Sequence, residues 1–155
     1  MKPDTALRPL MIVDDSENDA ALLTYSLEAI GVQNPIRHFR SANDAFKFLK
    51  PHLPPAKAVE PLPAAMFLDV NMPDFSGFDL LMWVRQQPTF LPMKAFVVSG
   101  ANEPSDAQIA ATFGADRYLR KFPELDELTE LLADICSLSP PTSAPTPPSG
   151  TRPRF

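Results

Sequence analysis

Cysteine is almost absent from this chain of 155 residues, which contains only Cys136. A single cysteine cannot form an internal disulfide, and the shortage of cysteine and histidine also disfavours the ligand sets that zinc usually requires. Cys136 falls within an apolar pattern of helical spacing. We therefore interpret it as a small core residue rather than as a nucleophile or a metal ligand.

Long hydrophobic runs are also missing. A run such as 64–68 is far shorter than the about 20 apolar residues that a membrane-spanning helix needs. The N-terminal segment carries early charges and prolines, which do not fit a secretory signal. We therefore expect a cytoplasmic protein that does not bind membranes.

Positive charge is scarce as well, with 14 basic residues against 19 acidic ones and a net charge of -5. The basic residues do not cluster anywhere along the chain. Because binding to nucleic acid needs a concentrated basic surface that displaces counterions, the sequence disfavours DNA or RNA as a direct partner.

What the sequence does contain is an alternation of short apolar segments with amphipathic ones. Strands are predicted at 10–13, 36–39, 64–68, 94–99 and 117–121. Helices are predicted at 17–30, 42–50, 78–85, 104–113 and 124–136. This alternation is typical of an α/β fold, in which helices cover both faces of an open, doubly wound, mostly parallel sheet.

Two proline-rich stretches lie outside this pattern. The segment 51–63 is so rich in proline that no regular element is expected there, and we interpret it as a loop insertion. The segment 138–155 is rich in Pro, Ser and Thr and buries too little apolar surface to offset the entropy of ordering. We therefore predict one domain at 7–137 and a flexible tail at 138–155.

Polar side chains stand where the predicted strands end. Asp14 and Asp15 follow the first strand, Asp69 follows the third, Ser99 closes the fourth and Lys121 closes the fifth. In an open parallel sheet, ligands bind at the carboxyl ends of the strands. Carboxylates gathered there repel one another unless a cation lies among them, and oxygen ligands of this kind suit Mg²⁺.

This set of side chains fits phosphoryl transfer. With a divalent ion and Lys121 beside Asp69, charge on a transferred phosphoryl group would be stabilised while an Asp69 oxygen acts as the attacking atom. Ser99 could donate a hydrogen bond to a phosphoryl oxygen. The two histidines, His38 and His52, are expected to lie away from this edge of the sheet.

Four stretches, "IVDDSEND", "FLDVNMPDFSG", "VVSGA" and "GADRYLRK", occur in this order between residues 10 and 135. Together they resemble the receiver domains of bacterial two-component response regulators. The resemblance implies a flavodoxin-like (βα)5 receiver fold with strand order 2-1-3-4-5. It also implies a phosphoacceptor at Asp69, a metal site formed by Asp14, Asp15, Asp69 and Asn71, and a switch and phosphoryl-binding set formed by Ser99, Tyr118 and Lys121.

The function that the resemblance implies is that of a single-domain response regulator. Such a protein is a phosphorelay switch rather than an enzyme: with Mg²⁺, it would accept a phosphoryl group from a sensor histidine kinase on Asp69 and signal through contacts with a downstream protein. The insertion at 51–63 is similar to that of stand-alone regulators associated with phytochrome-type kinases. Helix 78–85 is apolar on nearly all faces, which fits either core packing or an exposed Leu80 or Trp83 that docks a kinase or a second subunit.

Two other functions stay open at this point. Lys121 is followed by Phe122 and not by the proline usual in the family, and a cis bond before a residue other than proline costs about 2.5 to 4 kcal/mol. We therefore expect this loop to be rebuilt, which would fit a degenerate receiver that acts as a scaffold. A phosphatase of the haloacid-dehalogenase type is the other alternative, although Asp69-Val70-Asn71 lacks the second aspartate of that family's DxD motif.

Overall fold

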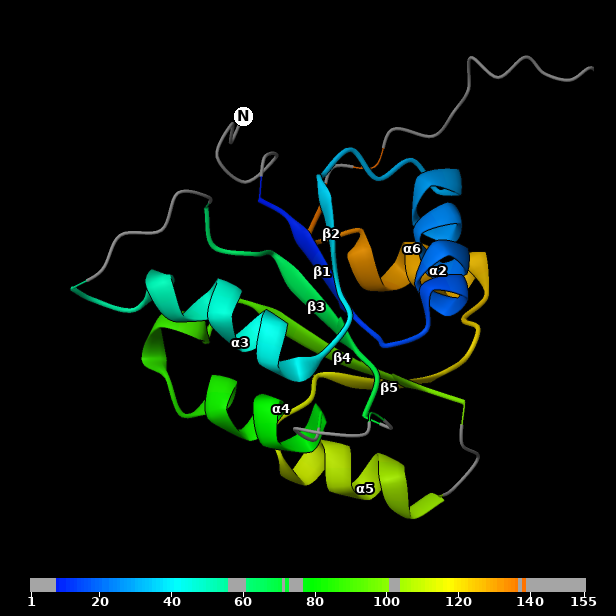
Figure 1. The fold of residues 1–155 in the computed structure, drawn as a ribbon. Coiled ribbons are helices and arrows are strands. Elements are labelled where there is room, and N and C mark those ends of the chain that lie inside the picture. The colour runs from blue at the N-terminus through cyan, green and yellow to red at the C-terminus, as the bar shows by residue number, and fades with distance from the viewer. Residues whose placement is uncertain are drawn as a thin grey trace, which may run out of the picture.

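The computed structural model describes residues 8–55, 61–70, 72, 77–100, 104–136 and 138. One parallel sheet runs through these residues in the order β2-β1-β3-β4-β5, which confirms the predicted fold and strand order (Figure 1). Its strands are β1 (Leu10–Val13), β2 (Ile36–Phe39), β3 (Ala65–Leu68), β4 (Lys94–Ser99) and β5 (Arg117–Arg120).

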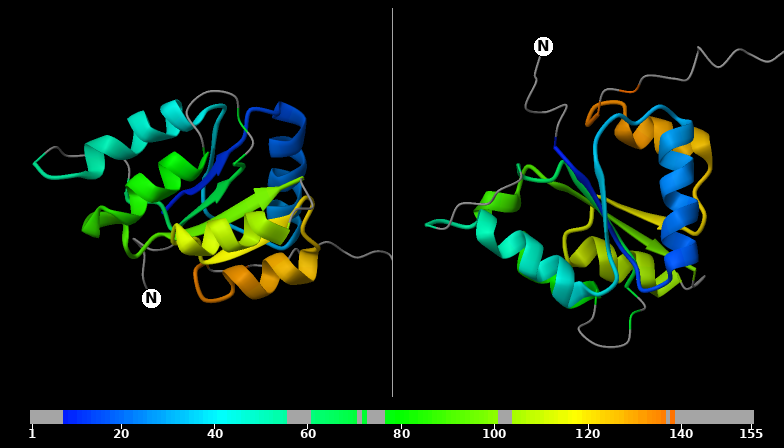
Figure 2. Two further views of the ribbon diagram at one scale, coloured as in Figure 1. Left: turned by 90° about the horizontal axis from the view of Figure 1, so that it is seen from below. Right: turned by 45° about the horizontal axis from the view of Figure 1, so that its top comes forward.

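Helices cover both faces of this sheet (Figure 2). One face carries α2 (Glu17–Ala29) and α6 (Leu125–Leu132), and the other carries α3 (Ala42–Leu49), α4 (Gly77–Arg85) and α5 (Pro104–Thr112). Two short 3-10 helices, η1 (Lys50–His52) and η2 (Pro88–Phe90), follow α3 and α4. None of the helices that the structure describes is both long and apolar enough to cross a membrane.

The start of α2 forms as its sequence predicts. Ser16 has extended backbone angles, and its hydroxyl accepts a hydrogen bond from the Asp19 amide at 3.1 Å. This bond satisfies one of the amides that lack a partner at a helix N-terminus. Beyond the helix, Gly31 has a φ of 90°, a backbone conformation that residues with a side chain rarely adopt.

The apolar core consists of two clusters, one on each face of the sheet. All residues of β1 and β3 are buried, as expected for central strands of a parallel sheet. Towards one face, Leu23 and Leu27 of α2 pack with Leu128 and Leu132 of α6. Together the two clusters make the sheet a rigid support for the loops at its carboxyl edge.

Helix α4 settles one of the alternatives left open above. Leu80 is fully buried, and the Trp83 ring packs against Phe46 and Phe90 at centroid distances of 4.6 and 5.6 Å. The interpretation of this helix as part of the core is therefore confirmed. The idea that Leu80 is an exposed docking residue is wrong, whereas Trp83 is only partly buried and Met82 of the same helix is exposed.

Most element boundaries lie within one residue of the predicted ones, and two predictions differ by more. The last helix ends at Leu132 rather than at 136, because the chain turns there and brings Leu138 into an antiparallel bridge with Val32. The segment 51–63 is not without regular structure, since η1 extends into it; Pro51 fits the first turn, where its missing amide is not needed. Residues 56–60 of the insertion and 139–155 of the tail lie outside the described residues.

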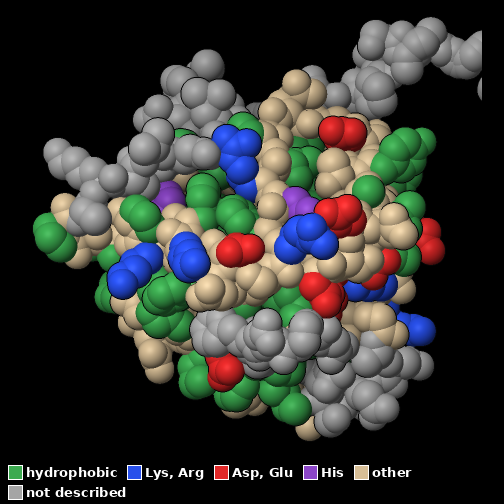
Figure 3. Space-filling model, in the orientation of Figure 1, with side chains coloured by type: hydrophobic (Ala, Val, Ile, Leu, Met, Phe, Trp, Pro, Cys, Tyr) green, Lys and Arg blue, Asp and Glu red, His purple; other side chains and the backbone are tan. Residues whose placement is uncertain are grey.

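Charged side chains of both signs alternate over the face of the molecule seen in Figure 3. One such pair on the surface is Arg40 and Glu17, whose charged atoms lie 3.0 Å apart. On the face shown, basic groups are interspersed with acidic ones.

Candidate functional site

Two buried aspartates lie side by side at the carboxyl edge of the sheet. Asp14 follows β1 and Asp69 follows β3, and these strands pair with Val13 opposite Leu68. The Asp69 amide donates a hydrogen bond to the Val13 carbonyl at 2.9 Å, so the pairing continues one residue past the strands. The side chains are therefore fixed by the backbone of two central strands, and only 5% and 6% of the surfaces of the two residues are exposed.

Asp15 completes a group of three carboxylates. Each of Asp14, Asp15 and Asp69 offers an oxygen, and these oxygens lie within 4.8 Å of one another. Oxygen ligands at such a spacing fit a hard divalent cation with room for water. Asn71, whose carbonyl is the fourth expected ligand, lies outside the described residues. The predicted convergence of the three aspartates is thus found in the structure.

The charge on Asp14 is costly in this setting. Burial raises the pKa of the Asp14 carboxyl above its usual value, and the nearby charge of Asp69 raises it further. The Ser16 amide, which donates to Asp14 Oδ1 at 2.9 Å, and the Lys121 ammonium act in the opposite direction without cancelling the effect. A divalent cation at this position would therefore relieve an unfavourable arrangement of charge.

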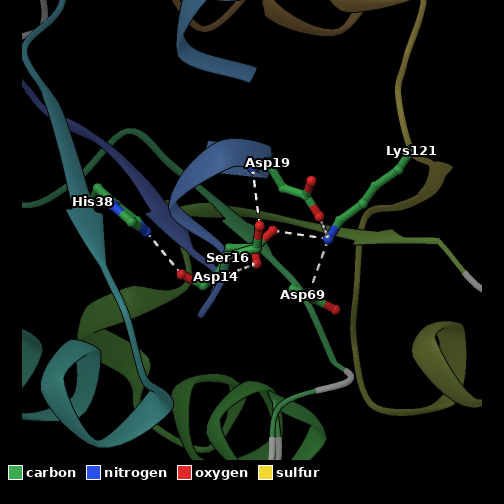
Figure 4. Close-up of polar contacts among 6 residues, drawn as sticks. All are labelled: Asp14, Ser16, Asp19, His38, Asp69 and Lys121. Carbon is green, nitrogen blue, oxygen red and sulfur yellow. Dashed lines mark hydrogen bonds and ion pairs between the residues drawn. The ribbon is translucent and has the colours of Figure 1, made fainter. Parts of the chain in front are cut away.

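Lys121 places its ammonium among these acids (Figure 4). Its Nζ lies 2.9 Å from Asp14 Oδ2, 2.8 Å from Asp19 Oδ2 and 3.1 Å from Asp69 Oδ2. Burial alone would lower the pKa of this ammonium, but the hydrogen bonds to Asp19, Asp14 and Asp69 outweigh burial and raise the pKa above its ordinary value. Lys121 therefore remains charged at neutral pH.

The expectation of a rebuilt loop after Lys121 is wrong. The Lys121-Phe122 peptide is cis although no proline is present, and the Lys121 amide donates to the Ser99 carbonyl at 3.0 Å. This backbone bond and the carboxylates around Nζ keep the lysine directed at Asp69. The replacement of proline by Phe122, whose side chain is partly exposed, leaves the lysine in place.

Ser99 and Tyr118 lie on one face of the sheet. Ser99 is the last residue of β4 and is fully buried. Since side chains alternate along a strand, Ser99 shares the face of Val97, which pairs with Tyr118 of β5. The Tyr118 ring is partly buried against the apolar cluster of that face. A hydroxyl and an aromatic ring thus lie on the same face of neighbouring strands, with Ser99 two residues beyond the partner of Tyr118.

Two residues near the acids were missed by the sequence analysis. The sequence pattern assigns no role to Asp19, yet its carboxylate contacts Lys121. His38 was expected to lie away from the site, and that expectation is wrong: its Nε2 donates to the Asp14 carbonyl at 2.8 Å. His38 comes near the site because β2 pairs with β1, which places His38 opposite Ile12, two residues before Asp14. His52, the last residue of η1, forms a hydrogen bond with the carbonyl of Leu49, the last residue of α3. This histidine is therefore part of the segment after α3, as its position in the sequence suggested.

Gly77 lies directly behind the Asp69 backbone. A Cβ atom added to Gly77 would come within 2.7 Å of both the Asp69 carbonyl oxygen and the Val70 Cα. Because both of these atoms belong to the backbone, they cannot move aside without shifting the site. The absence of a side chain at Gly77 therefore allows α4 to start close beneath Asp69.

These features define the class of protein as a doubly wound α/β fold with an acidic site at the carboxyl edge of its sheet. Comparison with known proteins identifies the family. Residues 10–133 match the family model described as the response regulator receiver domain. This chain belongs to the response regulator receiver family, which serves two-component signalling.

Two curated proteins are similar to this chain in sequence. A protein of Leptolyngbya boryana known as the uncharacterized 14.6 kDa protein in sodA1 3'region is 28% identical over 132 residues, which cover 85% of this chain and 92% of that protein. The alkaline phosphatase synthesis transcriptional regulatory protein PhoP of Bacillus subtilis is 29% identical over 114 residues, which cover 74% of this chain and 42% of PhoP. This chain therefore matches less than half of the length of PhoP.

Among solved structures, the bacteriophytochrome response regulator AtBRR has the same fold. It superimposes with a TM-score of 0.71 at 21% sequence identity, over 83% of this chain and 92% of AtBRR. At this identity the likeness establishes the fold, and the roles of individual residues rest on the geometry of the site.

Proposed function

We propose that this protein is a phosphorelay switch that accepts a phosphoryl group on Asp69. The observation that carries the proposal is the contact of 3.1 Å between Lys121 Nζ and Asp69 Oδ2, within a group of three carboxylates suited to a divalent cation. We assign Asp69 as the acceptor because its carboxylate is fixed and has two kinds of neighbour. These are the Lys121 ammonium and the carboxylates of Asp14 and Asp15, which follow β1.

In the proposed reaction, an Asp69 carboxylate oxygen attacks the phosphorus atom of a phosphohistidine on a histidine kinase. An O–P bond forms as the N–P bond breaks, and the imidazole nitrogen leaves with the bonding electron pair. Lys121 neutralises charge on the phosphoryl oxygens and holds them in line for attack. The receiver thus transfers a phosphoryl group to itself and does not turn over a separate substrate.

Mg²⁺ is the proposed cofactor. Asp14, Asp15 and Asp69 would hold it, with the carbonyl of Asn71 as a further ligand. When bound, the ion supplies positive charge next to the phosphoryl oxygens, which lowers the repulsion that an anionic donor meets from the carboxylates. The ordinary affinity of Mg²⁺ for carboxylate oxygens and water supports this choice over zinc.

The switch itself is proposed to involve Ser99 and Tyr118. Phosphorylation adds about -1.5 to -2 charges at neutral pH, and the Ser99 hydroxyl would donate a hydrogen bond to a phosphoryl oxygen. Movement of Ser99 toward that group leaves space for the Tyr118 ring on the same face of the sheet. The two side chains would thereby couple the site to the surface formed by α5, β5 and α6.

The proposed partners are a sensor histidine kinase and a downstream protein that recognises the phosphorylated surface. A kinase of the phytochrome type is supported by the insertion at 51–63 and by the shared fold with AtBRR, a bacteriophytochrome response regulator. A second copy of the chain is a further candidate partner. We also propose that the receiver domain occupies 7–137, that 138–155 is an appended tail, and that the protein acts in the cytoplasm.

The scaffold alternative has lost its main support, because Lys121 reaches Asp69 despite Phe122.

Incubation with acetyl phosphate and Mg²⁺, followed by intact mass measurement, tests the proposal. We expect an added mass of about 80 Da, the mass of one phosphoryl group, in the wild type and none in Asp69→Asn. Uptake that survives in Asp69→Asn would assign the acceptor to another residue. No adduct with acetyl phosphate or with phosphoramidate would favour the scaffold, and sustained hydrolysis of small phosphoesters would favour the phosphatase.

A further inference from the structure

Asp19 stands apart from the other partners of Lys121. It lies in the first turn of α2, and its Oδ2 is 2.8 Å from Lys121 Nζ, which is the shortest of the three carboxylate contacts (Figure 4). Asp14 and Asp69 belong to the group of oxygens that could hold a metal ion, whereas Asp19 does not. The lysine is thus shared between the metal-binding acids and one acid of a different kind.

Asp19 is itself held in place by a closed ring of contacts. Its amide donates to Ser16 Oγ at 3.1 Å, and the Ser16 amide donates to Asp14 Oδ1 at 2.9 Å. Asp14 Oδ2 in turn contacts Lys121, which returns to Asp19. The N-cap of α2 therefore fixes the backbone of Asp19 relative to Asp14, and from this position the Asp19 carboxylate contacts Lys121.

The three carboxylates that contact Lys121 differ in whether they would also bind the cation or accept the phosphoryl group. A divalent cation would draw on the oxygens of Asp14 and Asp69, and a phosphoryl group on Asp69 would replace the carboxylate with an acyl phosphate. The cation would compete with the ammonium for the oxygens of Asp14 and Asp69, and phosphorylation would move the negative charge on Asp69 from its carboxylate to the phosphoryl oxygens. Asp19 is outside the group of carboxylates that could hold the cation and is not the acceptor, so neither change draws directly on its contact with Lys121.

We propose that Asp19 is a positioning residue that keeps the Lys121 ammonium beside Asp69 while Asp14 and Asp69 are engaged by the cation and the phosphoryl group. The proposal rests on the function proposed above. Asp19, at the start of α2, would thus affect phosphoryl transfer only through its contact with Lys121.

The first test compares Asp19→Ala and Asp19→Asn with the matched controls Glu17→Ala and Glu17→Gln. Glu17 lies in the same turn and carries the same charge, but its partner is Arg40 and both side chains are mostly exposed. With acetyl phosphate and Mg²⁺, we expect the maximal phosphorylation rate of Asp19→Ala to fall about three- to ten-fold, as for the loss of one partly exposed charged hydrogen bond. The half-saturating donor concentration should stay the same, and the Glu17 variants should match the wild type.

The second test asks whether Asp19 acts through the lysine. In a Lys121→Met background, Asp19→Ala should cause no further loss of rate. In NMR spectra, the ε-methylene signals of Lys121 should move toward those of an exposed lysine in Asp19→Ala, and the movement should be larger with Mg²⁺ than with EDTA. Glu17→Ala should leave these signals unchanged.

The outcomes separate the two proposals. An equal rate in wild type and Asp19→Ala, a further loss in the Lys121→Met background, or unmoved Lys121 signals would each overturn the role of Asp19, provided that the wild type is phosphorylated on Asp69. If the wild type takes up no phosphoryl group, the proposed function fails, and the NMR signals still decide whether Asp19 holds the lysine.

Discussion

Lys121 is the residue on which the charge balance of the site depends. Asp14 and Asp69 are buried, and the ammonium contacts both. Coulombic repulsion between buried carboxylates is strong, and removing the ammonium from such an arrangement takes away its attraction for both of them. The lysine therefore stabilises the fold of the metal-free protein as well as serving the proposed chemistry.

The variant Lys121→Met should lose about 3 kcal/mol of unfolding free energy at pH 7 in EDTA, since it retains the volume of the side chain but leaves buried acids without their partner. Mg²⁺ should restore most of this loss. Urea unfolding measures both values, and Lys94→Met, at a half-exposed lysine, is the control that should change little. A loss that Mg²⁺ does not reverse would mean that packing of the side chain matters more than its charge.

The same comparison has a defined dependence on pH. The pKa of Lys121 is higher in the folded protein than its ordinary value of 10.5, so the folded state binds this proton more tightly than the unfolded state. The advantage of the wild type over Lys121→Met should thus be constant from pH 7 up to about 10. It should shrink as the pH rises further toward the folded pKa.

At the scale of elements, the approach of α4 to the end of β3 is the most restrictive contact. Gly77→Ala should destabilise the protein by about 2 to 4 kcal/mol, because the new methyl group meets backbone atoms of Asp69 and Val70 at 2.7 Å. Gly100→Ala is a matched control, since its Cβ would lie 3.9 Å from the nearest atom, a carbon of Lys121. Thermal unfolding of the two variants checks this; equal stability would show that α4 can shift at little cost.

The end of α6 offers a test of burial. Cys136 is 7% exposed, and burial raises the pKa of its thiol to about 11, although Arg8 acts weakly in the opposite direction. The folded protein should therefore react with a disulfide reagent at pH 8 far more slowly than the protein in urea, because reaction requires the exposed thiolate. Release of the coloured thiol measures the rate. Fast reaction in the folded state would mean that the segment after Leu132 opens readily.

The sequence was sufficient to predict elements whose pattern is local. The strand ends are predictable at Asp14, Asp69 and Ser99, because each follows directly on an apolar run of a few residues. The contacts of Asp19 and His38 were not predictable, since they depend on how far a side chain reaches between elements distant in the sequence. The cis peptide after Lys121 likewise had no signal in a sequence that lacks proline at that position.

At the scale of the whole molecule, Mg²⁺ should stabilise the protein by mass action. At free Mg²⁺ of about 100 times its dissociation constant, the expected gain in unfolding free energy is about 2.7 kcal/mol. Asp14→Asn should abolish most of this gain. Its metal-free form should be more stable than the wild type by about 1 kcal/mol, because burial disfavours the charged form of Asp14, whose pKa is raised above 3.8.

Unfolding in urea with EDTA or with Mg²⁺ checks this prediction, and Glu28→Gln on the exposed side of α2 is the control for loss of one negative charge. The sign follows from linkage. Because the folded-state pKa of Asp14 is raised, its contribution is most favourable below pH 3.8 and declines as the pH rises through the folded pKa. A metal-free Asp14→Asn protein that is less stable than the wild type would contradict the raised pKa.

The position of Lys121 along the chain also has a consequence for synthesis. Asp14, Asp19 and Asp69 leave the ribosome well before the Lys121 ammonium, which contacts all three. Domains generally fold as units during translation, and here the first three strands carry their acids without that counter-charge until β5 and the residue after it have emerged. A nascent chain stopped before Lys121 should therefore hold its amino-terminal half together poorly, and free Mg²⁺ in the cell would be the substitute that keeps the early strands from repelling one another.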